Sequence, residues 1–374
     1  EVTDPTHVGN VPFTVDGTQK RFRLGVDSLR QFIAFRDANY LVPTRVGPVQ
    51  SQNLHASPIP TDLVIVCPPE FMGSAQLLAQ RRMSEGLQVA LVTPQQVFNE
   101  FSSGARDATA IKRYMRMLYD KAGTDPQLLP RYLLLFGDGS FNNISLNYNN
   151  QNWIPTYQTE DALDPSKSYT SDDYFGLLDI NEGEYTGDLV DIGIGRLCVS
   201  DAQQAQEVVS KLLGYDSFRL LSSTGDNCSA TGDGGIADWR THVLFVSDDQ
   251  EGDGFEGVIH MDQSDFLARR VENEHPYLNV DKIYMDAYQQ VSTPGGERYP
   301  QASADLREKV QKGLLLVNYV GHGGEVGWAH ERLLDNGIIQ GWSNKDRLPL
   351  FMTATCEFSR WDDPSRTSAG ELVL

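Results

Sequence analysis

Basic residues are scarce in this sequence, and their scarcity excludes several classes of function. The 374 residues include 31 Lys and Arg against 51 Asp and Glu, which gives a formal net charge of −20. Proteins that bind nucleic acid need a basic surface to neutralise phosphates, so this composition argues against a nucleic-acid partner. It also argues against an electrostatic hold on anionic lipid.

Long apolar runs and metal-binding cysteine pairs are missing as well. No apolar segment is long enough to span a bilayer, and no basic region followed by an apolar stretch predicts a signal peptide in this chain. The four cysteines, Cys67, Cys198, Cys228 and Cys356, lack CxxC or Cys/His spacing, which argues against structural zinc. We expect Cys67 and Cys198 to be buried small side chains, while a disulfide between them stays open.

Turn-forming and apolar segments divide the chain into three parts. Residues 1–57 end at a Pro-Ile-Pro linker and are interpreted as a lead-in segment or the tail of a preceding β domain. Residues 58–221 and 222–374 are predicted to form two α/β subdomains, divided by a Ser/Gly/Asp-rich stretch. The chain opens without Met and stops in what resembles the start of a helix. We therefore expect a piece of a longer protein, with the second subdomain truncated at its C-terminus.

Short apolar runs alternate with helical periodicity from residue 62 onwards, which predicts βαβ crossovers and parallel sheets. The expected strands are residues 63–67, 87–93, 132–136, 192–196, 242–247 and 280–284. The expected helices are residues 72–85, 109–122, 202–215, 264–274 and 302–312.

Two further apolar runs near the C-terminus each stop at a reactive side chain. Residues 313–321 lead to His322, and residues 348–355 lead to Cys356. Because ligand chemistry in open parallel sheets gathers at the carboxyl ends of strands, we expect these side chains to meet at one edge. A thiol and an imidazole are the nucleophile and the base of a cysteine enzyme. The nearby Trp328 and His330 are interpreted as a packed connection.

The residues around these strand ends resemble a known family. Asn318-Tyr319-Val320-Gly321-His322-Gly323, followed by Ala354-Thr355-Cys356, is similar to the gingipain-type cysteine peptidases, which are relatives of caspases and legumain. The resemblance covers residues 60–374. Within this family the chain, including its lead-in segment, most resembles the type IX secretion system sortases, the C-terminal signal peptidases of Bacteroidetes. The resemblance implies a caspase-like parallel-sheet sandwich.

The resemblance also implies roles for individual residues. Cys356 would be the nucleophile and His322 the proton shuttle, with the Gly323 N–H as a candidate oxyanion donor. Asp249 is the predicted residue that orients His322, with Asp248 as the alternative. A further alternative is that both are solvated carboxylates at a strand end, with no part in catalysis. Gingipains specific for arginine carry an acidic residue where this alignment places His260, which favours a pocket for a small or polar side chain. The other predicted substrate contacts are Asp262, Gly321, Ala354 and Thr355.

A function follows from the resemblance as an expectation. The chain would cleave the C-terminal sorting domain from secreted cargo and pass the new C-terminus to a lipopolysaccharide amine or to water. The expected partners are cargo proteins, an outer-membrane β-barrel and the lipopolysaccharide acceptor, and the expected location is the bacterial cell surface. No cofactor is needed for the chemistry, although the acidic residues 226–253 suit structural calcium. The alternatives are a secreted endopeptidase and a catalytically silent docking module.

Overall fold

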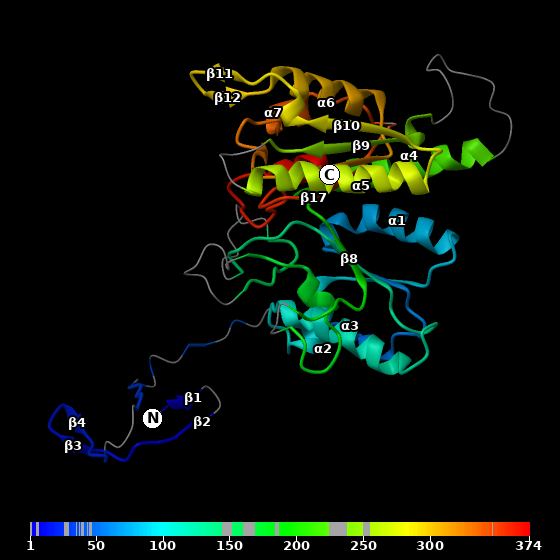
Figure 1. Cartoon of the computed structure of the whole chain (residues 1–374). Coiled ribbons are helices and arrows are strands. Elements are labelled where there is room, and N and C mark those ends of the chain that lie inside the picture. The colour runs from blue at the N-terminus through cyan, green and yellow to red at the C-terminus, as the bar shows by residue number, and fades with distance from the viewer. Residues whose placement is uncertain are drawn as a thin grey trace. The chain divides into compact units, whose positions relative to one another are not determined.

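The computed structural model in Figure 1 describes residues 47–143, 152–159, 169–183, 187–223, 238–249, 255–345 and 347–374, with shorter stretches before residue 47. The chain divides into two compact units, Glu1–Ser51 and Gln52–Leu374. The first unit contains two antiparallel strand pairs, β1 (Val2–Asp4) with β2 (His7–Val8) and β3 (Thr14–Asp16) with β4 (Gln19–Arg21).

The second unit begins slightly earlier than the predicted boundary at residue 57. Glu100 accepts hydrogen bonds from the Gln52 amide and from the backbone N–H of Leu54, at 2.8 and 2.7 Å. These bonds attach residues 52–57 to the α/β body. The hydrophobic pattern of the sequence could not have predicted them.

The first half of this unit is built on a parallel sheet with the strand order β6-β5-β7-β8. Its strands are β5 (Leu63–Val66), β6 (Val89–Val92), β7 (Tyr132–Phe136) and β8 (Gly193–Leu197). Val64 and Leu133 face one side and pack on α2 (Pro94–Phe101) and α3 (Ala108–Ala122). Leu63 and Ile65 face the other side and pack on α1 (Met72–Ser84) and α4 (Ala202–Ser223). The half is therefore a three-layer sandwich.

Local signals explain why α3 forms where it does. Ile111, Tyr114, Met115 and Leu118 are buried and recur at the spacing of one helix face. Asp107 caps the first turn by accepting the N–H of Thr109, and the helix ends at Gly123, whose φ of 62° suits glycine.

The second half repeats this arrangement around a parallel sheet with the order β10-β9-β13-β17. Its strands are β9 (His242–Ser247), β10 (Asn279–Tyr284), β13 (Leu316–Val320) and β17 (Leu350–Ala354). Figure 1 shows α5 (Phe255–Glu274) and α6 (Pro300–Lys312) on opposite faces of this sheet. The short helix α7 (Asn336–Gln340) joins α6 in covering its face.

Smaller elements complete the second half. β11 (Val291–Thr293) and β12 (Gly296–Arg298) form a hairpin before α6. β14 (Gly323–Gly324), β15 (Gly327–Trp328) and β16 (Leu334–Asp335) form a three-stranded antiparallel sheet directly after β13. The chain ends in α8 (Ala369–Val373).

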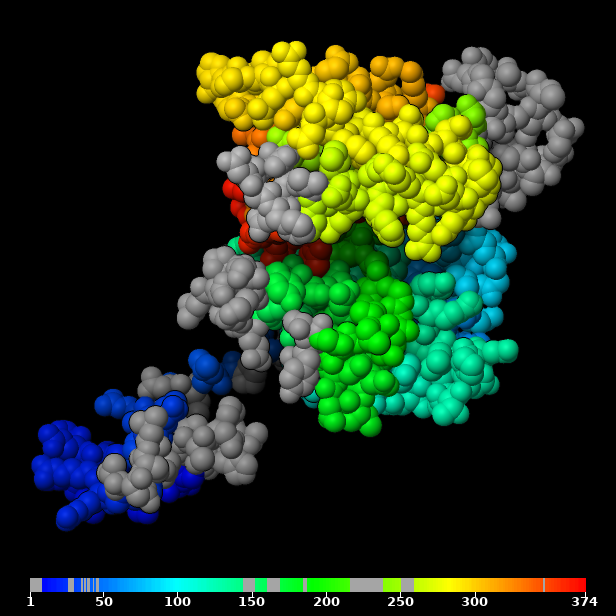
Figure 2. Space-filling view, in the orientation of Figure 1, coloured from blue at the N-terminus to red at the C-terminus, as the bar shows by residue number. Residues whose placement is uncertain are grey.

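Residues near the C-terminus join the two halves. The guanidinium of Arg196 on β8 is paired with Asp172 at 2.8 Å and lies 4.2 Å from the centroid of the Trp361 ring. The backbone N–H of Phe141 donates to the carbonyl of Asp362 at 2.7 Å. Figure 2 shows this red C-terminal segment between the yellow second half and the green first half.

The structure confirms the predicted class of fold: two α/β halves with parallel sheets. Helix α2 was not expected, although Thr93 and Gln96 form a capping box, which is a recognisable start signal. Cys67, Cys198 and Cys356 are free thiols, so the open Cys67–Cys198 disulfide does not form. Cys67 is buried as expected and Cys198 partly so, whereas Cys228 lies outside the described residues. Among the described helices, none is long and apolar enough to cross a membrane.

One buried carboxyl group at this junction couples stability to pH. Burial, together with repulsion from Glu371, raises the pKa of Asp138 to about 7, against the hydrogen bonds from Gly139 and Ser200, which lower it. The raised pKa means that the folded state holds this proton more tightly than the unfolded state. The resulting stabilisation is complete below the ordinary value of 3.8 and is lost as the pH rises through about 7.

We expect Asp138→Asn to remove this pH dependence, because the amide stays neutral. At pH 8 the variant should be more stable than the wild type by about 1–3 kcal/mol, with a much smaller gain at pH 5. Urea unfolding at both pH values measures the difference. Asp173→Asn, at an exposed carboxylate, is the matched control. An equal change in stability at both pH values would contradict the assignment.

Candidate active site

The pairing of β13 with β17 brings the predicted nucleophile and base to one edge. Val320 pairs with Ala354 at the ends of these parallel strands. His322 and Cys356 each follow two positions after this pair, and the N–H of Gly321 donates to the carbonyl of Ala354 at 3.3 Å. The two reactive side chains therefore leave neighbouring strands at the same level, as the sequence predicted.

A buried carboxylate from the next strand holds the backbone of His322. Asp248 directly follows β9 and is fully buried, and its Oδ2 accepts the His322 N–H at 2.8 Å. The chains approach closely at this point, since a Cβ on Gly321 would lie 2.5 Å from the Cβ of Asp248. Glycine at 321 is thus what allows the carboxylate to reach His322.

Three buried carboxyl groups gather behind His322. Oxygens of Asp248, Asp249 and Glu331 all lie within 4.8 Å of one another, and the three residues are 0%, 5% and 7% exposed. Tyr299 donates its hydroxyl to Oδ2 of Asp249 at 2.8 Å. Burial raises the pKa of Asp248 to about 6; the charge of Asp249 raises it too, while the His322 and Asp249 N–H groups lower it.

The structure thus separates the two candidates for the orienting acid. Asp248, the alternative, contacts the backbone of His322 and has an oxygen within 4.8 Å of a ring nitrogen of His322. The carboxylate of Asp249, the first choice, is bonded to Tyr299. The role of Asp249 stays a prediction, and the geometry favours Asp248 as the positioning residue.

Cys356 stands at an exposed turn immediately after β17. Its thiol is free, and the next residue, Glu357, has a φ of 50°, in the left-handed region that few non-glycine residues adopt. Ala329 and Arg332, in the connection after β15, have φ values of 59° and 58°. Such strained positions cluster at functional sites, where the surrounding structure holds them in place.

Contacts between Gly323 and Thr355 tie the His322 loop to the Cys356 loop. A Cβ on Gly323 would lie only 2.3 Å from the Thr355 hydroxyl oxygen. That oxygen is buried and has no hydrogen-bond partner among the described residues. Of the predicted substrate contacts, Thr355 and Gly321 are thus near the reactive pair, and Ala354 is the exposed last residue of β17.

Two further histidines surround His322. The ring of His260, on α5, lies edge-on with its centroid 5.0 Å from that of His322. The exposed His330 is stacked at 5.7 Å. Asp262, two residues after His260, is exposed on α5. The expected packed connection holds for Trp328, which is fully buried and stacks on Tyr319 at 4.3 Å.

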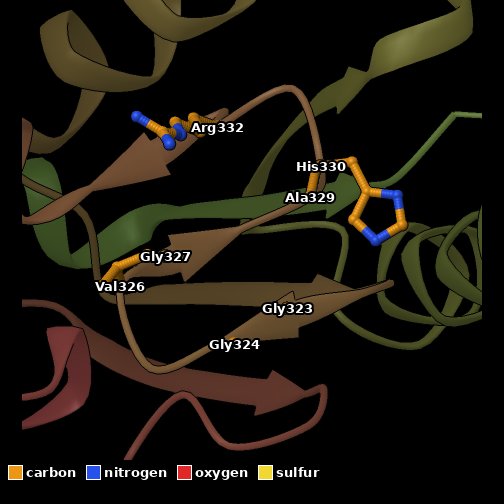
Figure 3. A pocket seen from close by; sticks show the side chains of 7 residues that line it. All are labelled: Gly323, Gly324, Val326, Gly327, Ala329, His330 and Arg332. Atoms are coloured by element: carbon orange, nitrogen blue, oxygen red, sulfur yellow. The ribbon is translucent and has the colours of Figure 1, made fainter. Parts of the chain in front are cut away.

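A cavity of about 240 Å³ opens beside His322. Its lining residues are Gly323, Gly324, Val326, Gly327, Ala329, His330 and Arg332. Figure 3 shows glycine backbone along β14 and β15, with the His330 and Arg332 side chains projecting from the connection that follows. None of these lining residues carries a carboxylate. The cavity is small, apolar along its glycines, and positively charged at Arg332.

Two sets of side chains have the spacing of metal ligands. Asp248, Asp249 and Glu331 offer hard oxygen atoms of the kind calcium prefers, although calcium takes six to eight of them. Calcium therefore stays a prediction, and residues 226–237 and 250–253 of the predicted acidic region lie outside the described residues. The second set, Asp248, His260 and His322, mixes nitrogen and oxygen ligands.

Comparison with known proteins agrees with this arrangement. The profile of peptidase family C25 matches residues 56–374. The chain belongs to this family. It is accordingly a cysteine peptidase of the gingipain type, and the resemblance found in its strand-end motifs is confirmed. No curated protein sequence matches the chain.

Two solved structures of gingipain R share the fold of this chain. The arginine-specific proteinase gingipain R (RgpB) has a TM-score of 0.55 at 16% identity, covering 87% of this chain and 60% of its own. The complex of Porphyromonas gingivalis RgpB pro- and mature domains has a TM-score of 0.52 at 16% identity, covering 79% and 55%. Dimeric latent PorU from Porphyromonas gingivalis is 34% identical, covering 49% of this chain and 18% of its own, with a TM-score of 0.42. The chain thus spans less than two thirds of each structure.

Some residues of the site carried no sequence signal. Tyr299 and Glu331 lie far from Asp249 along the chain and reach it only through the fold. Arg332 stands in a segment interpreted as a connection. Its position two residues after His330, within a glycine-rich stretch, was the one available indication.

The pH dependence of Cys356 reactivity distinguishes the two acids. We expect the rate of labelling by a thiol-directed acyloxymethyl ketone to fall as the pH drops through about 6, where Asp248 loses its charge. Asp248→Asn should lower this rate by about ten-fold or more and remove the step near pH 6. Asp249→Asn is the matched comparison, with a smaller loss and the step retained. The opposite order of effects would assign the positioning role to Asp249.

A pair of glycines tests the contact between the two loops. Gly323→Ala would push a methyl group into Thr355, so the His322 and Cys356 loops must separate. We expect the labelling rate to fall by about ten- to a hundred-fold, because small displacements of reacting groups are costly. At Gly324 an added Cβ meets nothing within 4 Å, so Gly324→Ala should lose far less. Equal losses would contradict the proposed coupling.

Proposed function

We propose that this peptidase cleaves a C-terminal sorting domain from secreted cargo and transfers the new C-terminus to an amine or to water. Two observations carry the proposal: the thiol of Cys356 is free and exposed, and the loop that begins directly after His322 encloses a cavity with no carboxylate in its lining. The exposed thiol bears on which acceptor can reach the acyl group, and the cavity bears on which substrate side chain is bound next to the cleaved bond.

The chemistry requires two successive acyl transfers at Cys356. Its thiolate attacks the scissile carbonyl carbon, the C–N bond breaks, and the leaving amine takes a proton from the His322 imidazolium. An acceptor amine or water then attacks the thioester and gives a proton back to His322, and the C–S bond breaks to restore the thiolate. Asp248 stabilises the charged imidazole in both steps.

The cavity supports a preference for small or polar residues over arginine. At about 240 Å³ it suits a single short side chain. A basic side chain would meet Arg332 and find no carboxylate among the lining residues, so charge repulsion would oppose its binding. His260 does not line this cavity, so its predicted place in the substrate pocket stays a prediction.

Exposure of Cys356 supports transfer to a bulky acceptor. A thioester formed there is reachable from solvent, so an amine on a large glycan can approach it as well as water. We propose the lipopolysaccharide amine as this acceptor, the outer face of the bacterial outer membrane as the location, and a β-barrel of the secretion system as the partner that presents cargo.

The test replaces Cys356 in the producing bacterium. In a Cys356→Ala strain we expect cargo to keep its sorting domain, because no thioester can form. Immunoblotting of surface cargo for the sorting domain measures this. Cys198→Ala is the matched control, since burial raises the pKa of the Cys198 thiol and keeps it unreactive.

Two other results would redirect the assignment. Normal cargo processing in the Cys356→Ala strain, with loss of general proteolysis, would favour the secreted endopeptidase. Absence of Cys356 labelling in the folded, reduced full-length protein would favour a silent docking module. With purified protein, cargo and an added amine, mass spectrometry of the product distinguishes the amide from the free acid.

A further inference from the structure

The side chains of Asp248, His260 and His322 form a cluster, and its geometry does not depend on the substrate proposed above. One carboxylate oxygen and one ring nitrogen from each histidine all lie within 4.8 Å of one another. Each side chain comes from a different element: the end of β9, the helix α5 and the end of β13. The fold therefore assembles the cluster, which no sequence spacing could have shown.

We propose that this cluster binds a divalent transition-metal ion of the zinc class and that the bound ion inhibits the peptidase reversibly. Two imidazoles and one carboxylate are a ligand set that favours zinc over calcium or magnesium, which prefer oxygen alone. Three protein ligands leave a further position for water, as in sites where the metal can enter and leave.

The surroundings hold the ligands in a suitable arrangement. Oδ2 of Asp248 accepts the His322 N–H at 2.8 Å, and Oδ1 accepts the Asp249 N–H at 3.1 Å, which fixes the plane of the carboxylate. The rings of His260 and His322 are nearly perpendicular, at 88°, with centroids 5.0 Å apart. Backbone support of this kind orients metal ligands in many proteins.

Accessibility also suits exchange with solvent. Asp248 is fully buried at the base of the cluster, while His260 and His322 are both partly exposed. An ion can therefore reach the histidines without unfolding. The three ligand atoms already lie within 4.8 Å of one another, and an ion with bonds of about 2.0–2.1 Å would draw them closer together.

The consequence for catalysis follows from the role of His322. A ring nitrogen bound to the metal cannot accept or donate the proton that each acyl transfer requires. The metal-bound enzyme is inactive at Cys356 even though the thiol itself is not a ligand. Removal of the ion by a chelator restores the proton shuttle.

The decisive experiment measures Zn²⁺ binding to the full-length Cys356→Ala protein by isothermal titration calorimetry. We expect one Zn²⁺ per chain, because the proposed ligands exclude the thiol. Adding His260→Ala should weaken binding by at least about ten-fold, as expected for the loss of one ligand. His275→Ala, at an exposed histidine directly after α5, is the matched control and should leave the affinity unchanged.

Inhibition is then measured in protein that retains Cys356. Zn²⁺ should slow acyloxymethyl ketone labelling, EDTA should restore it, and His260→Ala should need at least about ten-fold more Zn²⁺ for half-inhibition of its own metal-free rate. His260→Gln serves as a second variant if His260→Ala does not fold. The proposal would be overturned if the Cys356→Ala protein did not bind Zn²⁺, or if both His260 variants bound it with unchanged affinity. Neither result depends on cargo processing, so the proposed function is tested separately.

Discussion

The register between β13 and β17 is the constraint on which the active site depends. Val320 lies opposite Ala354, and from that pair each strand runs two residues further to its reactive side chain. Val317 and Tyr319 are fully buried, and burial of such side chains stabilises a strand by about 1.5–3 kcal/mol each. A slip of one residue would turn them to the opposite face and separate His322 from Cys356. The core of the sheet thus holds the chemistry in register.

The carboxyl groups behind His322 illustrate the cost of such an arrangement. Three acids lie almost without exposure within 4.8 Å of one another, an arrangement that desolvation and mutual repulsion both oppose. Hydrogen bonds offset part of this cost: two backbone N–H groups donate to Asp248, and the Tyr299 hydroxyl donates to Asp249. The same burial that makes Asp248 a strong electrostatic partner for an imidazolium also makes it a firm ligand for a cation. Catalysis and metal binding therefore draw on one set of side chains.

Glycine has a positional role on both sides of His322. Gly321 admits the carboxylate of Asp248, and Gly323 admits the Thr355 side chain from the neighbouring loop. Beyond them, the glycines of β14 and β15 leave a cavity whose one permanent charge is Arg332. In the function we propose, the loop after the base contributes to specificity together with the residues next to the nucleophile. The C-terminal segment contacts this loop region, because Arg360 pairs with Glu325 at 2.7 Å and the Ala369 N–H donates to the carbonyl of Glu325 at 2.7 Å.

The sequence by itself determined the alternating α/β halves, the parallel sheets and the placement of His322 and Cys356 after the ends of neighbouring strands. Those features follow from apolar periodicity and from motifs that are continuous along the chain, so they can be read locally. The contact of Asp248 with the backbone of His322, the approach of His260, and the positions of Tyr299 and Arg332 were decided only by tertiary structure. They depend on how a helix, a hairpin and two strand ends pack around the His322 imidazole. The distances between such elements cannot be derived from the spacing of residues along the chain. Asp248 and Asp249 are adjacent at the end of β9, yet Asp248 accepts the His322 N–H whereas Asp249 accepts the Tyr299 hydroxyl.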